Sequence, residues 1–366
     1  AQEIANTLNA MANLGLSADD LEVVLRLAVS RNAQGFNAQN IANTLNAMAK
    51  LGLSVGDLEV ILLSAVSRNT QYFNAQGIAN TLNAMSKLGL SAGDLEKILL
   101  PAISRNVKDF NAQGIANTLN AMANLGLSVE GLEKILLSAI SRNVKDFNAQ
   151  GIANTLNAMA NLGLSVEGLE KILLSAISRN VKDFNAQEIA NTLNAMAKLG
   201  LSAEGLEKIL LSAVSRNAQH FNAQEIANTL NAMAKLGLSA DDLEKILLSA
   251  ISRNTQYFNA QDIANTLNAM AKLRLVDQTL ISHLLGRSQD MRLDDIECLQ
   301  VYHAAYWARY VWKMAVDKLP KHIIHSANEY LTQSVTVSGL QSDVISLFSS
   351  IYPVSYTHLR AHETEA

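Results

Sequence analysis

Asparagine and glutamine side chains recur in this sequence every 37 residues, an arrangement that can bind a periodic ligand. In the predicted helix that follows Phe36, the side chains of Gln39, Asn43, Asn46 and Lys50 project from one narrow arc. Asn and Gln can pair a donor and an acceptor with the edge of a base, and repeat proteins can bind one base per unit. The candidate RNA-binding amides and lysines are Asn43, Asn46, Lys50, Asn80, Asn83, Asn117, Asn120, Asn154, Asn157, Asn191, Asn194, Lys198, Asn228, Asn231, Lys235, Asn265, Asn268 and Lys272.

One arginine also recurs per repeat, at the end of the predicted second helix. Arginines at equal spacing can follow the phosphates of a single strand. An arginine near a helix C-terminus can instead satisfy carbonyl groups and the helix dipole, and the asparagines can serve only to solvate an outer face. The candidate phosphate contacts are Arg68, Arg105, Arg142, Arg179, Arg216 and Arg253.

These side chains are positioned by a tandem repeat of fixed length. A phenylalanine opens each copy, at Phe36, Phe73, Phe110, Phe147, Phe184, Phe221 and Phe258, and a partial copy precedes them. A period of this length is typical of stacked supersecondary units. We therefore predict an all-α fold, a right-handed α-solenoid of 37-residue helix-turn-helix repeats with a helical C-terminal cap.

Each repeat contains the start and stop signals of two helices. In the copy at Phe73, Asn74 is the predicted N-cap of the first helix, Gly89 its stop, and Ser91 the N-cap of the second helix. Phe73 and Ile78 have the spacing of a hydrophobic staple. Three later copies contain a predicted capping box, at Asn185/Glu188, Asn222/Glu225 and Asn259/Asp262. The short connection between the helices predicts an antiparallel hairpin.

We predict three segments along the chain: a repeat array at 1–289, a helical module at 290–353, and a tail at 354–366 that is not native. The last repeat is degenerate, because Arg274 replaces the stop glycine. In the module we expect one long helix from Asp294 to Val316, a second helix after Pro320, and a third after Ser338. The tail contains His358 and His362, but no third ligand stands near them, so we expect no metal site.

Composition narrows the function classes. The net charge is only −4, so bulk charge favours neither nucleic acid nor a basic partner. The single cysteine, Cys298, excludes an internal disulfide framework. No apolar run is long enough for a membrane span, and we find no phosphate loop, nucleophile elbow or metalloprotease motif. We expect a monomeric protein that is not an enzyme and has no cofactor.

The run FNAQNIANTLNAMAKLG at Phe36–Gly52 resembles the octotricopeptide-type helical repeat, over nearly three quarters of the chain. It is also similar to a bacterial repeat family of unknown function. Val335–Ile351 resembles the segment that precedes the RAP domain of octotricopeptide and FAST-kinase-like proteins. The usual tryptophan of the octotricopeptide first helix is asparagine here, as at Asn46, and the repeats are nearly uniform.

The resemblance implies single-stranded RNA binding in RNA processing, stability or translation. It implies an organelle location, a mitochondrion or chloroplast, if the protein is eukaryotic, and a cytoplasmic or host-delivered one if it is bacterial. The alternative hypothesis is a protein-interaction scaffold that binds a peptide on its concave face.

Overall fold

The computed structural model describes residues 2–15, 22–90, 96–316 and 319–333, and every regular element in these residues is helical. The chain divides into two compact units, Ala1–Gln256 and Tyr257–Ala366. None of the described helices is long and apolar enough to cross a membrane. The tail, including His358 and His362, and the segment at Val335–Ile351 lie outside the described residues.

The first unit alternates two sets of helices. The first helices of its repeats are α1 (Gln2–Leu14), α3 (Ala38–Leu51), α5 (Ala75–Lys87), α7 (Ala112–Leu125), α9 (Ala149–Leu162), α11 (Ala186–Leu199) and α13 (Ala223–Lys235). The second helices are α2 (Glu22–Asn32), α4 (Glu59–Asn69), α6 (Glu96–Asn106), α8 (Glu133–Asn143), α10 (Glu170–Asn180), α12 (Glu207–Asn217) and α14 (Glu244–Asn254).

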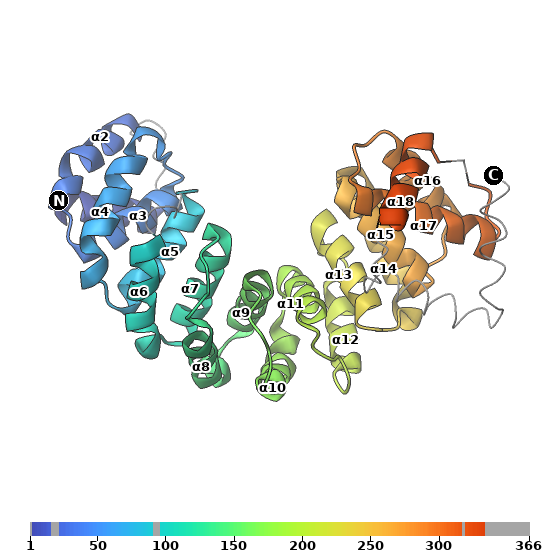
Figure 1. The fold of residues 1–366 in the computed structure, drawn as a ribbon, viewed down its shortest axis with the longest axis horizontal. Coiled ribbons are helices and arrows are strands. Elements are labelled where there is room, and N and C mark those ends of the chain that lie inside the picture. The colour runs from blue at the N-terminus through green and yellow to red at the C-terminus, as the bar shows by residue number, and fades with distance from the viewer. Residues whose placement is uncertain (1, 16–21, 91–95, 317–318, 334–366) are drawn as a thin grey trace. The chain divides into compact units, whose positions relative to one another are not determined.

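Successive repeats stack mainly through their first helices. Each first helix packs against the first helix of the next repeat, from α1 on α3 through to α11 on α13, and Figure 1 shows these helices following one another in chain order. Each second helix packs against its own first helix, and α4, α6, α8, α10 and α12 also contact the short 3-10 turn that ends the preceding repeat. The prediction of an all-α solenoid is confirmed.

A repeated apolar stripe forms the core between these helices. In the repeat that opens at Phe110, the side chains of Phe110, Ile115, Leu119 and Met122 are buried, together with Leu136 of the second helix. Phe110 and Ile115 occupy the two positions of a hydrophobic staple, which fixes the angle at which the chain enters α7. A single repeat has no second layer to cover this stripe, so its burial requires the neighbouring repeats.

The predicted caps of the first helices are confirmed. All three predicted capping boxes form, and a fourth, which the sequence analysis missed, joins Asn37 and Asn40. The stop glycines adopt the left-handed conformation, as Gly126 does at a φ of 65°.

The second helices begin later than predicted. Ser91 is outside the described residues, but at the equivalent Ser128 the hydroxyl accepts a hydrogen bond from the Glu130 N–H, and α8 begins only at Glu133. The serine therefore caps the turn before the helix.

The second unit contains α15 (Ala260–Leu273), α16 (Gln278–Gln289), α17 (Asp295–Tyr306) and α18 (Lys321–Gln333). α17 packs against both α15 and α18. The prediction of one α-helix from Asp294 to Val316 is wrong, because a π-helix at Trp307–Val311 follows α17. The rings of Trp307 and Trp312 lie 6.1 Å apart across this turn, and Trp307 is buried. The start of a helix after Pro320 is confirmed.

We predict that Arg274→Gly stabilises the protein. Arg274 ends α15 with a φ of 57°, the conformation that glycine adopts at this position in other repeats. A side chain in the left-handed region costs about 1 kcal/mol, so its removal should raise the free energy of unfolding by roughly that amount. The midpoint of urea unfolding measures the change. The reverse exchange, Gly126→Arg, is the matched control and should lower the midpoint. Equal midpoints for wild type and Arg274→Gly would show that the left-handed conformation of Arg274 costs no stability.

We also predict that the second unit loses stability in mild acid through His303. Burial, together with the positive charge of Lys272, lowers the pKa of this half-buried histidine from 6.5 to about 4. Between these two values the unfolded chain binds a proton that the folded chain does not, so stability falls as the pH falls. Across this pH range the free energy of unfolding falls by about 1–3 kcal/mol.

Thermal unfolding at pH 7 and pH 4.5 measures this dependence. His303→Gln should reduce the difference between the two melting temperatures, whereas His283→Gln, at an exposed position of α16, should leave it unchanged. The same pH dependence in all three proteins would show that another group is responsible.

Candidate nucleic-acid interface

A groove runs across four consecutive first helices of the first unit and brings the predicted amides together. This long groove has a volume of about 670 Å³ and extends from α3 to α9. Its polar lining comprises Asn46, Lys50, Asn80, Asn83, Lys87, Gln113, Asn117, Asn120, Asp146, Asn148, Gln150 and Asn154. Side chains that are 34–37 residues apart in the sequence therefore face one continuous surface.

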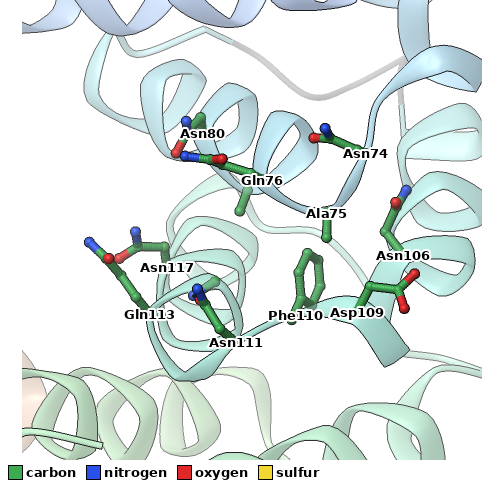
Figure 2. A pocket seen from close by; sticks show the side chains of 12 residues that line it. Asn74, Ala75, Gln76, Asn80, Asn106, Asp109, Phe110, Asn111, Gln113 and Asn117 are labelled. Atoms are coloured by element: carbon green, nitrogen blue, oxygen red, sulfur yellow. Dashed lines mark hydrogen bonds between the residues drawn. The ribbon is translucent and has the colours of Figure 1, made fainter.

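Two further grooves lie between the N-terminal halves of neighbouring first helices. The Tyr72 groove, between α3 and α5, has a volume of about 690 Å³, and the Asp109 groove, between α5 and α7, one of about 450 Å³. Figure 2 shows the amides of Gln76 and Asn80 on one side of the Asp109 groove and those of Gln113 and Asn117 on the other. Asn80 lines all three grooves, and Asn117 lines two of them.

The asparagines on the arc are half-buried rather than fully exposed. The side chains of Asn80, Asn83, Asn117 and Asn120 each have an intermediate exposure, because the next first helix packs beside them. Such a side chain has few rotamers left to lose when a ligand binds, which lowers the entropic cost of recognition. The amides are therefore both accessible and held in place.

The last repeat differs, because α17 covers part of the corresponding face. Asn268 is buried with 8% of its surface exposed, and the Asn265 Oδ1 accepts a hydrogen bond of 3.3 Å from Gln300 on α17. Both residues were candidate RNA contacts. The structure gives them a place in the packing of the second unit, and we do not include them in the proposed interface.

The repeated arginines connect neighbouring repeats. Each guanidinium donates a hydrogen bond to the first carbonyl of the short turn that ends the preceding repeat, which is a 3-10 turn in every pair except that with Ala218, and none lines the three grooves. The pairs are Arg68–Ala33 (3.1 Å), Arg105–Thr70 (3.0 Å), Arg142–Val107 (3.2 Å), Arg179–Val144 (2.9 Å), Arg216–Val181 (3.0 Å) and Arg253–Ala218 (2.9 Å). Of the two roles considered for these arginines, the geometry favours carbonyl binding, and phosphate binding stays a prediction.

A second recurring bond, which the sequence analysis missed, joins the asparagine after the arginine to the phenylalanine that opens the same repeat. The buried Asn143 amide donates to the Phe110 carbonyl at 3.2 Å and to the Ala139 carbonyl at 2.9 Å. Asn69, Asn106, Asn217 and Asn254 make the same pair of bonds. The only signal in the sequence was the constant Ser-Arg-Asn at the end of each second helix.

The lysines differ in position. Lys50 and Lys87 line the long groove, and Lys87 was missed although it has the same register as Lys50. The Nζ atoms of Lys50 and Lys198 lie 3.5 Å and 3.4 Å from the amide oxygens of Asn13 and Asn161, one repeat earlier. With two lysines and the single carboxylate of Asp146, the long groove is only weakly positive.

The fold and these grooves define an α-solenoid with a surface lined by side-chain amides. Residues 70–320 match the model of a family described as RNA-editing substrate-binding complex 6 protein. Because the match covers more than half of the sequence, the chain belongs to this family.

A second match, over residues 1–8, 13–45 and 57–82, is to a family described as protein of unknown function (DUF1601). No curated protein matches the chain significantly. The likeness to octotricopeptide repeats stays a resemblance.

We predict that Asn143→Ala destabilises the array by about 1–3 kcal/mol, the usual cost of leaving buried polar groups without partners. The variant removes the donor that joins the end of α8 to the carbonyl of Phe110, at the start of the same repeat. Urea unfolding, followed by circular dichroism, measures the loss. Asn124→Ala, at an exposed position of α7, is the matched control and should shift the midpoint little; if both variants shift it equally, the buried hydrogen bonds contribute nothing specific.

Proposed function

We propose that this protein binds single-stranded RNA without catalysing a reaction, and that its grooves hold the bases. The observation that carries this proposal is the long groove, in which amides of four consecutive repeats share one surface of about 670 Å³. A volume of this size is in the range of small-molecule and nucleotide sites. The family description, which names an RNA-editing substrate-binding complex, supports a role with RNA.

The chemistry of the lining favours bases over phosphates. An amide presents a donor and an acceptor side by side, which matches the edge of an unpaired base. Sequence-specific RNA recognition uses single strands, because the edges of their bases are free. Tyr72, with 69% of its surface exposed beside the Tyr72 groove, adds an aromatic face on which a base can stack.

The phosphates would have few partners in this arrangement. Lys50 and Lys87 are the cationic side chains of the long groove. Each neutralised phosphate of a single strand contributes about −0.7 to the slope of log affinity against log salt. Two contacts therefore give a slope of only about −1.4.

Protein binding is a second candidate, which a different surface favours. Val23, Val24 and Leu27 of α2 and Val60 of α4 are exposed, Val60 to 78%. Most other repeats have lysine at the position of Val23 and Val60, namely Lys97, Lys134, Lys171, Lys208 and Lys245. An apolar strip at the N-terminal repeats suits a protein partner and leaves the grooves free for RNA.

We predict that replacing both Asn80 and Asn117 by alanine weakens RNA binding strongly. A bidentate amide–base contact is worth about 1–3 kcal/mol, so the double variant should bind about 10- to 100-fold more weakly. Fluorescence polarisation with labelled homopolymer RNAs of equal length, in low salt, measures the affinity. Circular dichroism checks that the variant keeps its helices.

The matched control replaces two exposed amides of the second unit, Gln278 and Asn328, by alanine, and should bind as the wild type does. No binding of any homopolymer by the wild type would overturn the proposal. Binding that is lost equally in both double variants would place the RNA elsewhere on the protein.

A further inference from the structure

At each of the three grooves, a residue that directly precedes a repeat's phenylalanine stands at the edge. We call it the junction residue; the seven junction residues are Gly35, Tyr72, Asp109, Asp146, Asp183, His220 and Tyr257. Gly35 and Tyr72 line the Tyr72 groove, Asp109 lines the Asp109 groove, and Asp146 lines the long groove. Figure 2 shows Asp109 at the side of its groove, between Phe110 and Asn106.

The backbone anchors the junction residue while its side chain remains exposed. The 3-10 turn at Val107–Asp109 begins with the buried Val107, whose carbonyl accepts the hydrogen bond from Arg142. The buried Phe110 follows directly, so the chain is fixed on both sides of Asp109. The turn at Val144–Asp146 is held in the same way by Arg179. A fixed backbone beneath an exposed side chain is the arrangement that a selective contact requires.

The junction residue varies where the rest of the groove does not. The amides at the positions of Gln39, Asn43 and Asn46 are the same in every repeat from Phe36 to Phe258. The junction residues include glycine, tyrosine, aspartate and histidine. Differences between the ligand groups that successive grooves accept must come from positions that differ, and among the lining residues the junction residue differs most in chemistry.

Three consecutive junction residues are aspartates, and their carboxylates are available. No described residue pairs with the carboxylate of Asp109, Asp146 or Asp183, and all three side chains are exposed. An ionised carboxylate only accepts hydrogen bonds, so it suits a base that carries an exocyclic amino group. Uracil presents mainly carbonyl oxygens, which a carboxylate repels.

We propose that the junction residue selects the base at each groove, and that Asp109, Asp146 and Asp183 favour bases with an amino group over uracil. This inference rests on the proposed RNA binding. At Tyr72 the ring stacks on a base of any type, because every base has a π-face. The repeats that end with aspartate therefore discriminate between bases, and the Tyr72 groove adds affinity with less discrimination.

The test compares wild type with the triple variant Asp109→Asn, Asp146→Asn and Asp183→Asn. The RNAs are oligo(C), oligo(A) and oligo(U) of equal length, measured by fluorescence polarisation. We expect wild type to bind oligo(C) and oligo(A) at least about tenfold more tightly than oligo(U). The asparagines can also donate hydrogen bonds to uracil, so the variant should reduce this ratio to about threefold or less.

The control variant removes the same number of carboxylates from three consecutive repeats, through Glu130→Gln, Glu167→Gln and Glu204→Gln. These exposed residues line none of the three grooves, so the ratio between the RNAs should stay at the wild-type value. Base selection would be overturned if the aspartate variant kept the wild-type ratio of affinities, or if both variants gained affinity equally for all RNAs. Either result would leave the proposed RNA binding intact. Failure of wild type to bind any RNA would overturn the proposed function itself.

Discussion

The hydrogen bonds from the arginine at the end of each second helix to the backbone of the preceding repeat set the register on which the rest of the structure depends. The asparagine that follows fixes the second helix on the phenylalanine that opens its own repeat. Arg142 and Asn143 reach back 35 and 33 residues, to the carbonyls of Val107 and Phe110. Apolar packing alone is not directional, and it would tolerate small rotations of one repeat against the next. A hydrogen bond such as that from Arg142 to the Val107 carbonyl does not tolerate them, because its loss leaves a part-buried polar group unpaired. The phase between repeats is therefore fixed by polar atoms.

This fixed phase is what turns a repeated sequence into a continuous surface. The amides of Asn83 and Asn120 belong to different repeats, and only a constant rotation from one repeat to the next keeps both on the long groove. The same bonds hold the 3-10 turns, so the junction residues keep their positions at the groove edges. The arginines, which we first considered as phosphate contacts, thus contribute to the groove surface indirectly, by holding the backbone beneath it.

Local signals in the sequence were sufficient to predict the architecture but not to predict which side chains form the surface of the grooves. The period, the stripe of Ile115, Leu119 and Met122, and the capping boxes depend on residues close in sequence, and all were predictable. The partners of Asn143, the covering of Asn268 by α17 and the half-burial of the arc asparagines depend on contacts between residues that are far apart in the sequence. The π-helix after α17 could not be predicted either, because it depends on how Trp307 packs in the second unit. Tertiary contacts decide each of these features, and no periodicity encodes them.

The geometry of stacked helices also restricts which form of RNA could bind as we propose. Packed helices lie about 8–10 Å apart, whereas successive phosphates of one strand in a regular duplex are only about 3.4 Å apart along the axis. If a nucleotide chain follows the first helices, its successive bases must therefore lie farther apart than stacked bases do. A base-paired duplex cannot be stretched in this way without melting. With only Lys50 and Lys87 to bind phosphates in the long groove, the cost of unstacking must be offset by contacts to the bases. Amides repeated in every unit suit that requirement, because they stabilise each unstacked base in the same way, and selection between bases is then left to the few positions that differ.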